Sequence, residues 1–486
     1  MSTLPPPQLL IDGKLADASD GATFSIINPA TEAVIGHAPE ATDADVDGAL
    51  AAARRAFDDT NWAHDPAFRV HCLRQFKAAL DENIETLREI TIAEVGAPRM
   101  WTDGPQLQVP VDGLDYVIGL AENYQWSEDL GVAEPMGIPT RRTVLREPIG
   151  VVAAITPWNF PNQINLAKLG PALAAGCTVV LKPAPDTPWT AAELGRLIAE
   201  HTDIPAGVVN VITSSRNSVG AVLTEDPRVD MVSFTGSTAT GRAVMASASA
   251  TLKKVFLELG GKSAAIVLGD YDIPTAASMT AFSVSIHAGQ GCALTTRLIV
   301  PREKYDEAVA VAAATMAGIP AADPTDPGTI CGPVINATQR DRIEAYLASV
   351  TADGGTFATG GGRAAHEKGF WIEPTVVAGL TNEAKAAREE IFGPVLVVLP
   401  HDGDDDAIRI ANDSPYGLSG ALYCDDRERG MAAISKIRTG TMALNGGVWF
   451  SPDMPFGGYK QSGVGREMGV AGFEEYLEVK SVAEPA

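Results

Sequence analysis

The sequence predicts an open α/β protein, in which helices cover both faces of mostly parallel sheets. Apolar runs such as Val151–Ile155 show no alternation with polar residues, as expected of strands buried on both faces. These runs alternate with helical patterns at short spacing, which is the order of an α/β sheet. A chain of 486 residues also exceeds the size at which one hydrophobic core keeps growing. We therefore expect two or three domains.

The composition excludes several classes of protein. The net charge of −24 leaves no basic stripe for nucleic acid. The five cysteines are scattered, odd in number and without a Cys-x-x-Cys pair, so we expect no zinc site and a reducing, cytoplasmic setting. The N-terminus lacks the features of a secretory signal, and polar residues or prolines break every apolar run. We expect no membrane span and no metal.

The first part of the chain predicts a helical layer. Leu9–Phe24 reads as a hairpin around an Asp-Gly-Lys turn. The apolar spacing predicts a helix over Thr42–Phe57, with Thr42 as N-cap and Asp45 three residues later. Helical patterns continue over Pro66–Val95 and Pro110–Asn123, and Arg141–Val144 is expected to be extended.

From Gly150 onward, strands and helices alternate in two sets, with the linker between them expected near Gly260-Gly261. In the first set we predict strands over Val151–Ile155, Cys177–Leu181, Val208–Ile212, Val229–Phe234 and Val255–Leu259, and helices over Leu166–Ala175, Thr190–Glu200 and Val219–Thr224. In the second set we predict strands over Ala264–Leu268, Arg297–Val300, Phe370–Val376, Val395–Val398, Gly420–Tyr423 and Thr441–Leu444, and helices over Ile273–Ala288, Glu303–Met316, Asp405–Asn412 and Arg427–Ile437.

Two polar side chains follow predicted strands at the sheet edge where open α/β proteins bind ligands. Asn159 stands in a turn fixed by two prolines, where its amide can donate to a developing oxyanion or cap the next helix. Lys182 leaves a buried strand just before a proline, where it can bind ribose or phosphate or extend into solvent. The residues alone leave both pairs of alternatives open.

A third strand end predicts an anion site. After Phe234 the chain turns through Thr235, Gly236 and Ser237 into a helix, whose unpaired N–H groups suit a pyrophosphate. The Gly-x-Gly-x-x-Gly fingerprint is absent from the chain, so a dinucleotide site here would be of a non-standard kind.

Two acidic features are candidates for chemistry. Glu258 ends a mostly apolar strand, where it either pairs with Lys254 or Lys262 or serves as a general base. The acidic pair that includes Glu390 precedes a sharp Gly-Pro turn, which reads either as part of a site or as an exposed loop.

Cys292 follows a Gly-Gln-Gly turn. A free cysteine is usually a small buried hydrophobe, but as a nucleophile it needs a base, a tuned thiolate and an oxyanion pocket. Gly289 and Gly291 would let the backbone amide of Cys292 approach a ligand closely.

Seven of these motifs, in order along nearly the whole chain, resemble the aldehyde dehydrogenase superfamily. They are Pro157-Trp158-Asn159-Phe160-Pro161, Leu181-Lys182-Pro183-Ala184, Phe234-Thr235-Gly236-Ser237, Glu258-Leu259-Gly260-Gly261-Lys262, Gly289-Gln290-Gly291-Cys292, Glu389-Glu390-Ile391-Phe392-Gly393-Pro394 and Pro455-Phe456-Gly457-Gly458-Tyr459-Lys460-Gln461-Ser462-Gly463.

The resemblance implies a fold of two open α/β sheet domains and a small β-ribbon used for oligomerisation. The dinucleotide-binding domain would comprise residues 1–124 and 149–260, and the catalytic domain 261–460. The ribbon and C-terminal tail would comprise 125–148 and 461–486, giving a homodimer or homotetramer.

The resemblance also implies a reaction and a role for each matching residue. An aldehyde would be oxidised to a free acid with hydride transfer to NAD, with NADP not excluded. Cys292 would form the thiohemiacetal and thioester, Asn159 would hold the oxyanion, and Glu258 would activate the hydrolytic water. The cofactor would contact Ile155, Trp158, Lys182, Asp186, Gly236, Ser237, Glu390 and Phe392.

Three departures from the family pattern bear on specificity. Many NAD-using relatives carry Glu where this chain has Pro185, so Asp186 would supply the carboxylate instead. Thr213-Ser214-Ser215-Arg216 replaces the usual glycines near the adenine. The helix after Asn159 carries Asn162 and Gln163 where relatives are bulky and apolar, which implies a roomier tunnel. We expect the substrate pocket to include Ile164, Ala167, Phe450 and Phe456.

Two alternatives remain beside the hydrolytic enzyme. A CoA-acylating semialdehyde dehydrogenase releases the acyl group to CoA, but relatives of that kind generally lack the glutamate found here as Glu258. A catalytically silent structural relative is expected to have lost Cys292, Asn159 or Glu258, and all three are present.

Overall fold

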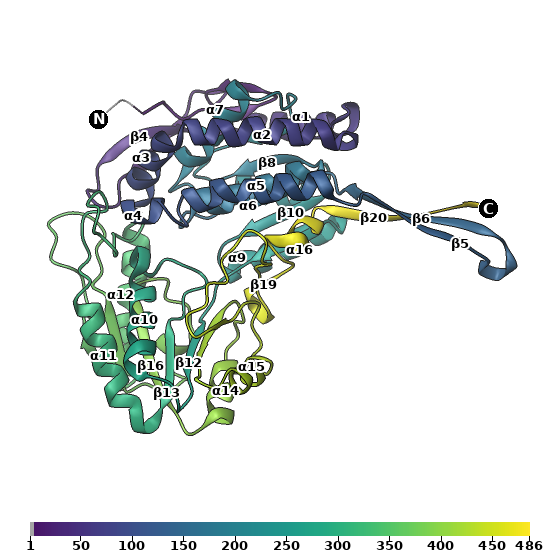
Figure 1. Cartoon of the computed structure of the whole chain (residues 1–486). Helices are drawn as coiled ribbons and strands as arrows, with labels where there is room; N and C mark the ends of the chain where they lie inside the picture. The colour runs from purple at the N-terminus through teal and green to yellow at the C-terminus, as the bar shows by residue number, and fades with distance from the viewer. Residues whose placement is uncertain (1–3) are drawn as a thin grey trace.

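The computed structural model describes residues 4–486, which form two large sheets, a three-stranded ribbon and a small two-stranded sheet (Figure 1). The first large sheet and its helices lie at the top of the view and the second large sheet lies below them. The ribbon projects sideways from the first sheet and carries the C-terminus at its end. No helix among these residues is long and apolar enough to cross a membrane.

The first sheet has the strand order β19-β11-β10-β7-β8-β9-β1-β2. Its strands are β1 (Leu9–Ile11), β2 (Lys14–Ala16), β7 (Val151–Ile155), β8 (Thr178–Lys182), β9 (Val209–Val211), β10 (Met231–Thr235), β11 (Lys254–Glu258) and β19 (Gly463–Val464). The five central strands are parallel, and their chain order across the sheet, 3-2-1-4-5, changes direction between β7 and β10. Ligands of open α/β sheets bind at such a switch point.

Helices cover both faces of this sheet, which explains its continuous apolar strands. Val151 and Ala153 pack on one face, against α1, α8 and α9, while Val152 and Ala154 pack on the other, against α2, α5, α6 and α7. The helices are α1 (Asp43–Asp59), α2 (Pro66–Glu82), α3 (Ile84–Val95), α4 (Arg99–Thr102), α5 (Gln108–Asn123), α6 (Pro161–Ala175), α7 (Pro188–His201), α8 (Asn217–Glu225) and α9 (Thr238–Ala248).

The second sheet has the order β14-β15-β16-β13-β12-β17-β18 and is parallel except for β14. Its strands are β12 (Ala264–Val267), β13 (Arg297–Pro301), β14 (Thr356–Thr359), β15 (Thr375–Ala378), β16 (Val395–His401), β17 (Gly420–Tyr423) and β18 (Ala443–Leu444). Its helices are α10 (Ile273–Ser285), α11 (Tyr305–Ala317), α12 (Ala337–Ala352), α13 (Lys385–Arg388), α14 (Asp404–Asn412) and α15 (Arg427–Ile434). The chain passes between the sheets at residues 259–263, where the sequence predicts the linker.

The ribbon joins distant parts of the chain. β5 (Ser127–Ala133) pairs with β6 (Thr140–Pro148), and β20 (Leu477–Pro485) adds to the other side of β6. Residues 463–464 pair instead with β11 of the first sheet, and α16 (Gly469–Glu474) packs on α6, so residues 461–476 are separate from the ribbon. The small sheet is β3 (Thr23–Ile27) with β4 (Val34–Pro39).

The sequence places most of these elements, and its errors have local causes. The predicted capping box is confirmed, since Thr42 and Asp45 exchange both bonds at the start of α1. The helix predicted over Ile273–Ala288 ends at Ser285, because the next turn needs left-handed backbone.

Two further boundaries are also wrong. The strand predicted over Phe370–Val376 starts only at Thr375, since Phe370 bonds to the loops at Pro29 and Val334 instead. The continuous helical pattern over Pro66–Val95 breaks at Asn83 into α2 and α3.

Candidate active site

A cavity of about 160 Å³ lies where the carboxyl edge of the first sheet meets the second sheet and its loops. It brings together segments that are far apart in the sequence. Its lining residues are Pro157, Trp158, Asn159, Thr235, Gly236, Ser237, Glu258, Leu259, Gly260, Cys292, Gln339, Arg342, Glu390 and Phe392.

The strand register aligns several predicted residues along this edge. Glu258 ends β11 opposite Thr235 of β10, and Ile155 ends β7 opposite Lys182 of β8. Because parallel strands end at the same edge, these residues form one row across the sheet. Ile155 and Lys182 stand next to the cavity rather than among its lining residues.

Cys292 is half-buried and reaches the cavity through a tightly turned loop. His287 and Ala288 adopt left-handed backbone at φ 48° and 52°, and Gly289 follows at φ 70°. A Cβ at Gly289 would lie 2.1 Å from the carbonyl oxygen of Gly393, so only glycine fits there. This contact presses the loop before Cys292 against the turn after Phe392.

A hydrogen bond ties Asn159 to the same loop. Its Nδ2 donates to the Gln290 carbonyl oxygen at 2.8 Å, two residues before Cys292, and Gln106 Nε2 donates to the Asn159 carbonyl oxygen at 2.9 Å. The amide has a second N–H available for a ligand. The α6 N-cap is Phe160 and carries no side-chain cap, so Asn159 does not cap this helix.

Glu258 is buried, and neither of its carboxylate oxygens has a hydrogen-bond partner among residues 4–486. Neither lysine considered as a partner binds it. Lys254 pairs with Glu475 at 3.2 Å, and Lys262 Nζ is itself unpartnered within the described chain. The carboxylate therefore faces the cavity unpaired.

Burial, together with the nearby Glu467 carboxylate, holds the pKa of Glu258 well above its usual range, partly offset by Lys168 and Arg466. Lys168 and Glu467 form a buried ion pair at 3.0 Å, and Lys168 also donates to Ser233 Oγ at 3.1 Å. Sequence reasoning missed this pair, whose members lie 299 residues apart. The one feature of the sequence that indicated a buried ion pair was the position of Lys168 within an otherwise apolar helix.

The Cys292 thiol shares this acidic surrounding. Burial, and then the carboxylates of Glu258, Glu390 and Glu467, raise the pKa of the thiol above its ordinary value. The thiol therefore keeps its proton near neutral pH until a base removes it.

The turn after β10 forms the wall of the cavity opposite the second sheet. Ser237 caps α9 by accepting the backbone N–H of Thr240 at 3.1 Å, and the Gly236 N–H donates to the Glu258 carbonyl oxygen at 3.0 Å. Thr235 Oγ1 is buried without a partner among residues 4–486. The N-terminus of this 11-residue helix thus faces the cavity, and polar groups there remain available to bind a ligand.

Glu390 and Phe392 approach from the second sheet. Glu390 Oε1 accepts the Gly261 N–H at 2.8 Å, and burial raises the pKa of its carboxyl to about 7. The Phe392 ring meets the Trp158 ring edge-to-face at 5.3 Å. The two rings close the cavity between the sheets.

Helix α12, which was not among the predicted helices, positions this segment. Gln339 Nε2 donates to the Phe392 carbonyl oxygen at 2.8 Å, and Arg342 Nη2 donates to the Glu390 carbonyl oxygen at 2.7 Å. Both side chains also line the cavity. Two signals could have indicated it: the Asn-x-x-Gln start, where Asn336 caps Gln339, and the helical spacing of the buried residues Ile343, Tyr346, Leu347 and Val350.

Lys182 lies beyond the cavity, beside the segment that departs from the family pattern. Its Nζ donates to the Ser214 carbonyl oxygen at 3.3 Å, and burial lowers the pKa of the amine to about 8, partly offset by Glu40. Glu40, in the loop before α1, accepts hydrogen bonds from the hydroxyls of Ser214 and Ser215. A carboxylate therefore lies close to Lys182.

Asp186, which the sequence favoured as the carboxylate near the ribose, binds a residue other than Lys182. Its Oδ1 accepts from Asn336 Nδ2 at 2.8 Å, at the start of α12, and burial raises the pKa of its carboxyl. The carboxylate beside Lys182 thus comes from Glu40, which sequence reasoning did not single out.

Of the predicted substrate-pocket residues, Ala167 and Phe450 line a second cavity between α5, α6 and the segment 450–473. Ile164 and Phe456 are buried and are not among its lining residues. No group of three or more His, Cys, Asp or Glu side chains suited to a metal ion occurs within residues 4–486.

The cavity at the edge of this open α/β sheet joins a cysteine, a carboxylate and an amide, which are the groups that an enzyme with a cysteine nucleophile needs. The chain belongs to the aldehyde dehydrogenase family, whose model matches residues 16–482. It is therefore an enzyme that acts on aldehydes, which this family oxidises to acids.

Known proteins similar to this chain match it over almost its whole length. Geranial dehydrogenase of Castellaniella defragrans is 37% identical and covers 99% of both chains. Betaine aldehyde dehydrogenase of Atriplex hortensis is 38% identical over 99% of this chain and 96% of its own. A mutant of aldehyde dehydrogenase C from Pseudomonas syringae, solved with NAD+ and octanal, superposes with a TM-score of 0.93 at 38% identity, covering 98% and 96% of the two chains.

Proposed function

We propose that this enzyme oxidises an aldehyde to the free carboxylic acid with NAD, through an acyl group carried on Cys292. The observation that carries the proposal is the convergence of Cys292, Glu258 and Asn159 on one cavity. In this role the glycine-containing turn before Cys292 and the proline-fixed turn around Asn159 bring nucleophile and amide together.

The chemistry begins with proton transfer. Glu258, whose raised pKa makes it a stronger base than an ordinary carboxylate, takes the thiol proton of Cys292. The sulfur then attacks the carbonyl carbon, and the new oxyanion is held by the free N–H of Asn159 and the backbone N–H of Cys292. A bound NAD would supply the hydride acceptor, and loss of the hydride from this carbon would leave a thioester on Cys292.

Hydrolysis completes the cycle. Glu258 first releases the thiol proton to solvent and then takes a proton from water, which attacks the thioester carbon and gives the free acid. The expelled Cys292 sulfur takes this second proton back from Glu258, which restores the starting state. The unpaired carboxylate of Glu258 supports water, rather than CoA, as the acyl acceptor.

The residues around the cavity fit a dinucleotide. The open N-terminus of α9 with Gly236 and Ser237 suits a pyrophosphate, and Lys182 suits the adenosine ribose. Glu390 would hold the second ribose, with Trp158 and Phe392 packing at the nicotinamide end and Ile155 along the cleft.

Glu40 supports NAD over NADP. Its carboxylate stands next to Lys182, where it can accept hydrogen bonds from ribose hydroxyls but repels a 2′-phosphate. Asp186, whose carboxylate accepts a hydrogen bond from Asn336, would then help to hold the wall of the site in place and would not contact the ribose.

The ribbon supports a homodimer or homotetramer. β5 and β20 are its two edges, and their open backbone groups can pair with another chain. Its exposed apolar side chains are Leu130, Val132, Met136, Ile138, Val479 and Val482. The five free cysteines support a reducing, cytoplasmic compartment.

The test is a spectrophotometric panel of aldehydes with NAD and with NADP, each with and without CoA. We expect NAD reduction and a free-acid product without CoA, and loss of both in Cys292→Ser. No reduced nicotinamide with any aldehyde, or an absolute requirement for CoA, would contradict the proposal.

A further inference from the structure

A small third cavity lies at the amino ends of β12, β13 and β17, directly after the segment 259–263 that joins the two sheets. In these neighbouring parallel strands, Ala264 stands opposite both Arg297 and Gly420. We propose that the cavity binds a single monatomic anion, such as chloride, held by the Lys262 amine and the Ser263 hydroxyl.

The first observation is a buried lysine without a partner. Four lysines are buried among residues 4–486, and three of them, Lys168, Lys182 and Lys253, donate hydrogen bonds to carboxylate, hydroxyl or carbonyl oxygens. Lys262 is 1% exposed, and its Nζ has no partner within the described chain. Because a buried charge is strongly disfavoured unless it is paired, this amine needs a negative ligand.

Arg297 brings a second positive charge to the same cavity. Its buried guanidinium donates only to neutral groups, which are Asn382 Oδ1 and the carbonyl oxygens of Lys262, Ile410 and Ala411. These four bonds leave one of its five N–H groups free. None of the thirteen side chains that line the cavity is a carboxylate, although the chain as a whole carries a net charge of −24.

The nearby carboxylate of Glu390 does not take the place of an anion. It accepts the Gly261 N–H at 2.8 Å and makes no hydrogen bond to Lys262 in the part of the chain that the structure describes. Burial, and then the charge of Arg297, lower the pKa of the Lys262 amine to about 7, partly offset by Glu390. An anion beside the amine would counter both causes.

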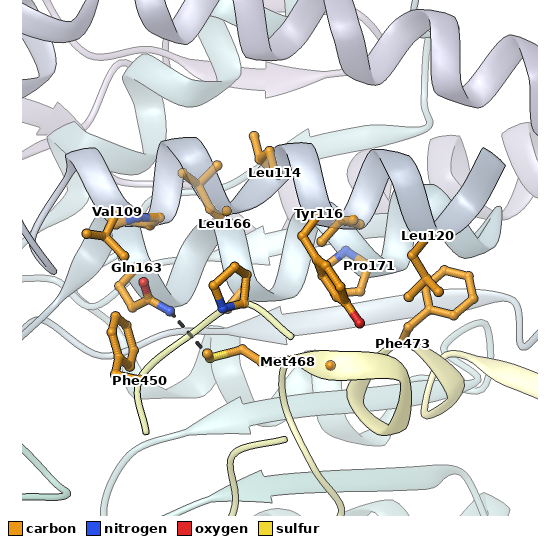
Figure 2. A pocket seen from close by; sticks show the side chains of 16 residues that line it. Val109, Leu114, Tyr116, Leu120, Gln163, Leu166, Pro171, Phe450, Met468 and Phe473 are labelled. Atoms are coloured by element: carbon orange, nitrogen blue, oxygen red, sulfur yellow. Dashed lines mark hydrogen bonds between the residues drawn. The ribbon is translucent and has the colours of Figure 1, made fainter. Parts of the chain in front are cut away.

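The size of the cavity sets the size of the ligand. Its volume of about 10 Å³ is near that of one water-sized particle, so phosphate, sulfate and carboxylates are too large. Ser263 Oγ, which is buried and without a partner among residues 4–486, supplies an O–H donor. The cavity between α5, α6 and the segment 450–473 is larger, and none of the side chains labelled there is charged (Figure 2).

The bound anion would stabilise the junction between the two sheets. The Arg297 N–H donates to the Ser263 carbonyl oxygen at 3.1 Å, and Arg297 Nε donates to the Lys262 carbonyl oxygen at 3.0 Å, so this junction is already fastened to the start of β13. A ligand that binds only the folded state raises its stability by mass action.

The first experiment measures the thermal unfolding midpoint of the full-length protein at constant ionic strength while chloride replaces gluconate, which is too large for the cavity. We expect the midpoint to rise by about 2 °C or more and then to saturate. Equal midpoints in the two salts overturn the inference.

Lys262→Met keeps much of the side-chain volume, removes the charge, and should abolish the chloride dependence. Lys436→Met is the matched control, because Lys436 is exposed and pairs with Asp405 at 3.7 Å, and it should keep that dependence. Should Lys262→Met fail to fold, Ser263→Ala is used, and the chloride concentration at half effect should rise about tenfold. Wild-type chloride dependence in Lys262→Met, or in Ser263→Ala where that variant is used, overturns the inference.

The second experiment locates the ion. Crystals grown in chloride and measured with long-wavelength X-rays should show an anomalous peak in the cavity beside Lys262 Nζ. Density there without an anomalous signal would identify a water molecule and overturn the inference.

Discussion

Replacing Asn159 by alanine separates catalysis from packing at this site. Asn159 Nδ2 has two N–H groups, one bonded to the Gln290 carbonyl oxygen at 2.8 Å and one free for the oxyanion. Losing an oxyanion donor typically lowers kcat about 100- to 1,000-fold. Orphaning the buried Gln290 carbonyl destabilises the fold by about 1–3 kcal/mol.

Asn162→Ala is the matched control for this variant. Asn162 is buried one turn further along α6 and donates to Thr91 Oγ1 at 2.8 Å and to the Gln106 carbonyl oxygen at 3.0 Å, but it does not line the catalytic cavity. We expect both variants to lower the thermal unfolding midpoint, and only Asn159→Ala to lower kcat beyond tenfold. Equal losses of kcat in the two variants would refute the oxyanion role and leave only a packing role.

Three further predictions concern the cofactor and the base. Glu40→Gln removes the carboxylate beside Lys182. The ratio of kcat/KM with NADP to kcat/KM with NAD should then rise by about tenfold or more, because roughly 1.4 kcal/mol of repulsion is lost. An unchanged ratio would exclude Glu40 from cofactor selection. Because Glu258 must be deprotonated to act and its pKa is raised, activity should fall as pH drops through a value above that of an ordinary carboxyl. Glu467→Gln removes a like charge and frees Lys168, both of which lower the pKa of Glu258, so this acid limb should move to lower pH in a kcat–pH profile. An unchanged acid limb would show that Glu467 does not act on the base.

The sequence predicted β7 to the residue because a strand covered on both faces carries an uninterrupted apolar run, and both faces of Val151–Ile155 are covered. Helix α12 has a weaker signal, the i, i+3, i+4, i+7 spacing of Ile343, Tyr346, Leu347 and Val350 among polar and charged residues, and this signal was overlooked. Its side chains Gln339 and Arg342 therefore escaped notice.

The sequence predicted which residues form the site, but it did not predict the residues with which they form hydrogen bonds and ion pairs. Motif resemblance singled out Asn159 and Glu258, yet the bond from Asn159 to Gln290 and the Lys168–Glu467 pair depend on contacts between segments that are far apart in the sequence. The carboxylate beside Lys182 illustrates the limit: sequence proximity favoured Asp186, whereas the fold brings Glu40 there from the loop before α1.

The most direct test of the account is single-turnover chemistry of Glu258→Gln with NAD and a saturating aldehyde, followed for long enough that Cys292 reacts slowly without the base. Rapid acid quench and peptide mass spectrometry should find up to one acyl group per chain, on Cys292, matched by one equivalent of reduced nicotinamide and followed by little further turnover. Sustained release of free acid at the wild-type rate, or an acyl group on any other residue, would contradict an acyl-enzyme on Cys292 that Glu258 hydrolyses.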